Sequence, residues 1–71
     1  MYMYDKSYVS SRINELYNKD ESKMNKMKRK HKVHKCIINN WIEGKAEPSL
    51  KYIVEIAREY NVNVDYFIKN I

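Results

Sequence analysis

Residues 33–44 read VHKCIINNWIEG, and their apolar spacing predicts a short helix that ends at a glycine. Ile38, Trp41 and Ile42 fall on one face of this helix, at the i, i+3, i+4 spacing of a buried stripe. Gly44 suits the position just after the helix, because glycine adopts the left-handed conformation without strain. We therefore predict a helix between residues 34 and 44, with Trp41 in the hydrophobic core.

The segment before this helix predicts a second helix with a thin apolar face. Ser22 can cap it, and it would run from Lys23 to about Lys30. Its apolar positions are Met24, Met27 and His31. About four residues separate this helix from the next, which is the spacing of a helix-turn-helix.

Three further helices are predicted on either side of this pair. The first has Val9, Ile13, Leu16 and Tyr17 on one face, and Ser7, Ser10 or Ser11 can cap it. The next follows Pro48 and has its apolar stripe at Leu50, Ile53, Val54, Ala57 and Tyr60. Asn63 can cap the last one, with Val62 and Phe67 as a hydrophobic staple. The expected fold is all-α: a compact five-helix domain over residues 7–71, after a flexible arm at residues 1–6.

The positive charge of the chain is concentrated in one segment. Seven of the fourteen lysines and arginines lie between Lys23 and Lys35, and no acidic residue lies between Ser22 and Ile42. The remaining residues carry seven positive and nine negative charges, so the formal net charge of +5 resides in this segment. Localised positive charge favours a polyanionic partner, and a basic segment beside a helix-turn-helix favours double-stranded DNA.

Several other classes of protein are not expected. The single cysteine, Cys36, excludes a disulfide framework and fits a reducing cytoplasm. No apolar run is long enough to span a membrane. His31, His34 and Cys36 lack the second pair of ligands that a zinc site needs, so neither a metal nor another cofactor is expected. No catalytic grouping is present, and an enzyme is not expected.

Three motifs stand out along the chain: Arg12-Ile13-x-x-Leu16, Ile38-x-x-Trp41-x-x-Gly44-x-x-x-Pro48-Ser49 and Val62-x-Val64-Asp65-Tyr66. With these motifs, residues 11–68 resemble the Cro and phage-repressor (XRE) family of DNA-binding proteins. This resemblance implies a lambda-repressor-like fold. The chain departs from the family pattern mainly in the second helix and the turn. Met24 replaces a frequent glutamine, Lys28 a small residue, Lys32 the turn glycine, and Ile42 a frequent glutamate.

In this family the third helix enters the major groove, which predicts the residues of the interface. The expected base contacts are Lys35, Cys36, Ile37 and Asn40. The expected phosphate contacts are Arg12, Lys23, Lys26, Arg29, Lys32 and Lys45.

The predicted function is sequence-specific DNA binding by a transcriptional regulator, most simply a cytoplasmic, nucleoid-associated repressor of prokaryotic or phage type. A homodimer is expected, because the end of the chain offers apolar side chains at Tyr66, Phe67, Ile68 and Ile71. One alternative is a helix-turn-helix-fold module that binds a protein partner, such as an antirepressor, an antitoxin partner or a phage-encoded inhibitor. Another is non-specific nucleic-acid binding through charge alone.

Overall fold

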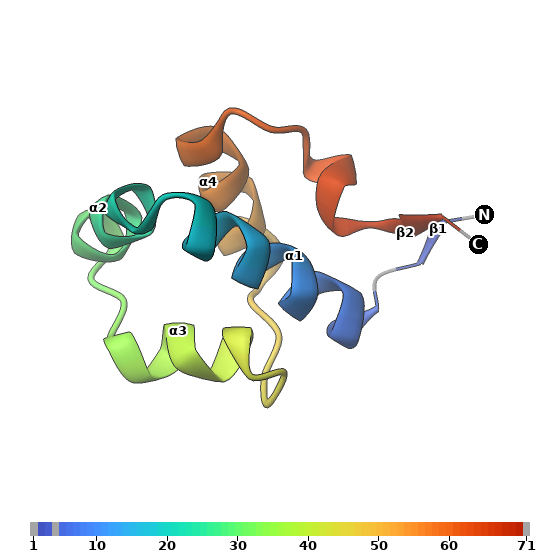
Figure 1. Ribbon diagram of the computed structural model, residues 1–71, viewed down its shortest axis with the longest axis horizontal. Coiled ribbons are helices and arrows are strands. Elements are labelled where there is room, and N and C mark those ends of the chain that lie inside the picture. The colour runs from blue at the N-terminus through green and yellow to red at the C-terminus, as the bar shows by residue number, and fades with distance from the viewer. Residues whose placement is uncertain (1, 4, 71) are drawn as a thin grey trace.

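Four α-helices and one short 3-10 helix form the body of the computed structural model, which describes residues 2–3 and 5–70 (Figure 1). In chain order the elements are β1 (Tyr2–Met3), α1 (Lys6–Lys19), α2 (Glu21–His31), α3 (Lys35–Ile42), α4 (Leu50–Tyr60), η1 (Val64–Phe67) and β2 (Lys69–Asn70). The all-α prediction is confirmed. The fifth predicted helix is η1, a single 3-10 turn, because only four residues separate its cap from the extended end of the chain.

One hydrophobic core joins all of these helices. α1 packs against α2, α3 and η1, and α2 packs against α4 (Figure 1). Trp41 and Phe67 are buried there, together with Val9, Ile13, Leu16, Met24, Met27, Val33, Ile38, Ile53, Ile56, Ala57 and Tyr60. The predicted stripe of α4 is corrected at three positions: Leu50 is 67% exposed, Val54 is half-buried, and Ile56, which was not predicted, is fully buried. Leu50 is the first residue of α4, and the helix reaches the core only one turn later.

The first two helices begin earlier than predicted, because aspartates cap them in place of serines. The Tyr8 N–H donates to Asp5 Oδ1 at 3.0 Å, so α1 begins at Lys6. Asp20 both ends α1 and caps α2, and its Oδ1 accepts from the N–H of Ser22 at 3.1 Å. The Ser22 hydroxyl donates to the same oxygen at 2.5 Å. These hydrogen bonds hold the pKa of Asp20 below its ordinary value, because they stabilise the carboxylate.

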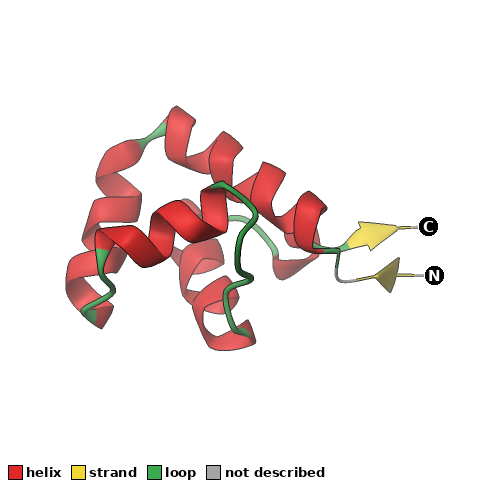
Figure 2. Cartoon of the chain, turned by 90° about the horizontal axis from the view of Figure 1, so that it is seen from below, coloured by secondary structure: helices red, strands yellow, loops and turns green. Residues whose placement is uncertain are grey.

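The two ends of the chain meet in a short antiparallel pair. Tyr2 lies opposite Asn70, and Met3 lies opposite Lys69. Figure 2 shows this pair projecting from one end of the helical cluster, and Figure 1 shows the α2–α3 turn at the other end. The flexibility expected of residues 1–6 stays a prediction.

The turn between α2 and α3 contains the three residues from Lys32 to His34. Lys32 takes the left-handed conformation, with φ 54° and ψ 45°. The next residue, Val33, is buried, and its N–H donates to the Lys28 carbonyl at 2.9 Å. His34 precedes α3 as the predicted N-cap, although its side chain makes no capping hydrogen bond. At the other end of α3 the predicted stop is confirmed, with Gly44 at φ 76°.

Candidate nucleic-acid interface

α3 presents its polar side to solvent because its apolar side is anchored in the core. Trp41 is 3% exposed, and its ring centroid lies 5.4 Å from that of Tyr52 in α4. The Ser10 hydroxyl of α1 donates to the Ile42 carbonyl at 2.7 Å and fixes the end of the helix. All four residues predicted to contact bases lie away from the core. Lys35, Cys36 and Ile37 are exposed, and Asn40 is half-buried.

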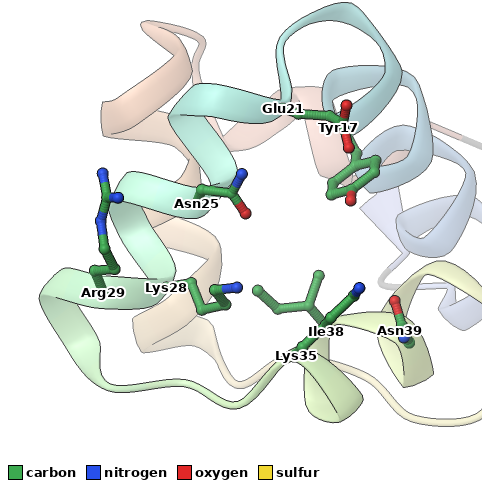
Figure 3. A pocket seen from close by; sticks show the side chains of 8 residues that line it. All are labelled: Tyr17, Glu21, Asn25, Lys28, Arg29, Lys35, Ile38 and Asn39. Atoms are coloured by element: carbon green, nitrogen blue, oxygen red, sulfur yellow. The ribbon is translucent and has the colours of Figure 1, made fainter.

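A groove of about 430 Å³ lies between α3 and the facing parts of α1 and α2 (Figure 3). The buried side chain of Ile38 forms the apolar floor of the groove, and most of the other lining side chains are polar or charged. Three of them are cations, one is an acid and two are amides. The lining residues are Tyr17, Glu21, Asn25, Lys28, Arg29, Lys35, Ile38 and Asn39.

The basic helix α2 has two flanks with different surroundings. Lys28 and Arg29 line the groove on the α3 side. Lys23 and Lys26 lie on the α4 side, where the Lys23 ammonium is 5.8 Å from the ring centroid of Tyr60. The Lys26 ammonium is 3.9 Å from Glu59 Oε2. Of the α2 residues predicted to contact phosphates, only Arg29 therefore lines the groove, and the roles of Lys23 and Lys26 stay predictions.

Arg12 is engaged within the protein, on the side of α1 that faces η1. Its guanidinium contacts Glu15 Oε2 at 2.9 Å and donates to the Tyr8 hydroxyl at 2.7 Å. Its guanidinium carbon also lies 4.7 Å from the ring centroid of Tyr66. The guanidinium holds the pKa of Glu15 below its ordinary value, as does a hydrogen bond from the Tyr66 hydroxyl. A phosphate contact by Arg12 stays a prediction, and the structure does not place it in the groove.

The other two predicted phosphate contacts lie at the two ends of α3. Lys32 is exposed in the turn before it. Lys45 follows it, and its ammonium lies 3.0 Å from Glu43 Oε2, with both side chains largely in solvent. An ion pair this exposed contributes little to folding stability, so Lys45 can exchange its contact with Glu43 for one with a phosphate.

Four charged or amide residues of the groove were not predicted from the sequence as contacts, namely Glu21, Asn25, Lys28 and Asn39. Helical spacing carried the signal that could have found them. Asn25 and Lys28 are three residues apart in α2, and Lys35 and Asn39 are four residues apart in α3. Residues so spaced share one face of a helix. Spacing alone does not show that these two helix faces line the same groove in the folded protein.

The residues considered as metal ligands are dispersed. His31 Nε2 lies 3.1 Å from Glu55 Oε2, which ties the end of α2 to α4. His34, the last residue of the turn, and Cys36 in α3 are both exposed. In the part of the chain that the structure describes, no group of three histidine, cysteine or acidic side chains is placed to hold a metal ion. Within residues 2–3 and 5–70, no helix has the length and apolar character needed to cross a membrane.

The α2–turn–α3 geometry and the exposed side of α3 define a helix-turn-helix protein. A family model described as helix-turn-helix matches residues 33–67, from the turn through η1. The chain belongs to the Cro and phage-repressor-type (XRE) family of DNA-binding helix-turn-helix regulators. The match begins after α2, the helix in which the sequence departs from the family pattern. No curated protein and no solved structure matches the chain in the corresponding comparisons.

Proposed function

We propose that this protein is a sequence-specific transcriptional repressor that acts by occupying its operator. The observation that carries this proposal is the position of the outer side of α3 beside the groove cations. Among the described residues, Lys28, Arg29 and Lys35 have no acidic group within ion-pair distance. Positive charge without acidic partners, next to an exposed helix, favours binding of that helix in the major groove of a DNA duplex.

In this proposal α3 lies in the major groove with its N-terminal half against base edges. The Lys35 ammonium can donate to guanine O6 and N7, and the Asn40 amide can pair with adenine through two hydrogen bonds. Ile37, 40% exposed, can contact a thymine methyl, and Cys36 is small enough to allow close approach. Phosphate contacts by Arg29, Lys32 and Lys45, with the more remote Arg12, Lys23 and Lys26, would set the position of α3 without specifying sequence.

We propose further that the protein binds DNA as a symmetric homodimer in the cytoplasm, associated with the nucleoid. Two copies would place their α3 helices in successive major grooves, about one helical turn apart. The surface first expected to join them needs revision. Phe67 is fully buried in the protein's own core, and Tyr66 is held against Glu15. Ile68 is half-buried, and Ile71 lies outside the described residues.

A gel shift at two salt concentrations, with a selected duplex and a random one, tests the proposed function. Sequence-specific repression predicts that the selected duplex binds more tightly at both salt concentrations. Uniform binding that weakens steeply with salt would indicate attraction by charge alone. No binding to either duplex would contradict the proposal.

A second candidate is a module that keeps the fold but binds a protein. One observation favours it: the groove carries Glu21 and the ring of Tyr17 as well as cations, so its surface is mixed in character. Such a surface suits an antirepressor, an antitoxin partner or a phage-encoded inhibitor. In that case a partner protein, and no duplex, would bind at Lys28 and Lys35, and substitution of either residue would weaken the protein complex.

A further inference from the structure

Lys28 lines the groove from α2. It is half-buried, and it is the central residue of the groove flank of α2, between Asn25 and Arg29. Figure 3 shows its ammonium pointing into the space between α2 and α3, toward Ile38. A small residue at this position would remove the cation from the groove. The lysine instead fills part of the space with its aliphatic stem and carries its charge to the opening.

The charges around this position are unbalanced. Lys28 and Arg29 of α2 and Lys35 of α3 all line the groove, and none of the three has an acidic partner among the described residues. Like charges that share a groove repel one another, and an anion between them relieves the repulsion. Glu21 lies at the other end of the groove, beside Tyr17, and its hydrogen bond raises the pKa of the Tyr17 hydroxyl. An anion is therefore favoured at the Lys28 end.

Two amides that can donate directed hydrogen bonds line the same groove. Asn25 projects from α2 into the groove, and Asn39 lies on the α3 wall (Figure 3). Each carboxamide has two N–H groups that can donate hydrogen bonds to phosphate oxygens. A groove with cations on both walls, an amide on each wall and an apolar floor has the donors that a phosphodiester group requires.

We propose that the groove between α2 and α3 seats a backbone phosphate of double-stranded DNA, with Lys28 as the residue that holds it. The inference rests on the proposed function, and it adds a positioning contact from inside the helix-turn-helix. Asn25 donates to the phosphate oxygens from the same wall, and Lys35 adds charge from the facing wall. The seated phosphate would set the depth at which α3 enters the major groove.

Salt-dependent binding of Lys28→Met and Lys30→Met, measured by fluorescence anisotropy on one selected duplex, tests the proposal. Methionine retains the length of the stem and the helix propensity, and it removes only the charge. Lys30 is the matched control, because it is exposed on the same helix and lies outside the groove. For Lys28→Met we expect the slope of log K against log salt to fall by about 0.9, and affinity at 0.1 M salt to fall roughly five- to tenfold. Lys30→Met should change both far less.

A second measurement uses the wild-type protein and does not depend on a variant. The side-chain amide signals of Asn25 and Asn39 should shift in nitrogen–proton NMR spectra when the duplex is added, while that of the exposed Asn18 should stay in place. If DNA binds but Lys28→Met matches Lys30→Met and the amides do not move, the seated phosphate is wrong and the proposed function stands. If no duplex binds, both are wrong.

Discussion

Lys32 holds a backbone conformation that lysine rarely adopts. Its φ of 54° lies in the left-handed region, where a Cβ atom is crowded by the backbone. Related proteins of the Cro and repressor type usually place a glycine at this point of the turn. The chain keeps the turn without it, because the buried Val33 and its hydrogen bond to the Lys28 carbonyl fix the exit from α2.

Lys32→Gly should therefore relieve about 1 kcal/mol of backbone strain in the folded state. Part of this gain is offset, because glycine raises the conformational entropy of the unfolded chain. Chemical denaturation at neutral pH measures the change. Asn61→Gly is the matched comparison, because Asn61 has φ 55° after α4 and asparagine tolerates that region better. A Lys32→Gly gain no larger than the Asn61→Gly gain would show that the turn is not strained.

Tyr60 makes a pH-dependent contribution at the junction of α1 and α2. Its hydroxyl donates to the Asp20 carbonyl at 2.6 Å. Burial, aided by the Asp20 carboxylate, raises the pKa of Tyr60 to about 12. The unfolded chain releases this proton near pH 10, so the contribution is complete below pH 10 and is lost as pH rises toward 12. Tyr60→Phe should cost about 1 kcal/mol at pH 7 and should flatten the fall in stability between pH 10 and 12. If the free energy of unfolding falls between pH 10 and 12 in Tyr60→Phe as it does in the wild type, then groups other than Tyr60 cause that fall.

At the scale of elements, α3 depends on one large side chain. Trp41 is buried in the core against Tyr52, and no other aromatic residue lies on α3. Trp41→Ala should lower the free energy of unfolding by about 3–5 kcal/mol, much of what a small domain has. Cys36→Ala, on the exposed side of the same helix, should stay within about 0.5 kcal/mol of the wild type. Thermal unfolding followed by circular dichroism compares them, and equal melting temperatures would contradict this account of α3.

Apolar periodicity predicted four of the helices well, because each buries a stripe that repeats at helical spacing. Capping was harder, since Asp5 and Asp20 compete with nearby serines and only the folded geometry shows which side chain reaches the free N–H groups. The last element, η1, was predicted as a longer helix than the structure has. Its Phe67 is buried as predicted, but an apolar pattern over four residues does not distinguish a 3-10 turn from an α-helix.

At the scale of the whole molecule, packing gives the two flanks of the basic helix α2 different surroundings, although lysines and arginines occur along its whole length. On the α4 side of α2, Glu55 and Glu59 lie close to His31 and Lys26. On the α3 side the cations of the groove have no such partners among the described residues. The sequence shows how much charge α2 carries, but which flank faces the acids of α4 depends on how the helices pack.

The central claim is that α3 recognises bases while the flank of α2 binds the backbone. Its most direct test measures Asn40→Ala and Arg29→Ala on a duplex selected from a random pool and on a random duplex, at one salt concentration. Asn40→Ala should cost about 1–3 kcal/mol on the selected duplex and much less on the random one. Arg29→Ala should weaken binding to both duplexes alike. Equal losses for Asn40→Ala on both duplexes would contradict base recognition by α3.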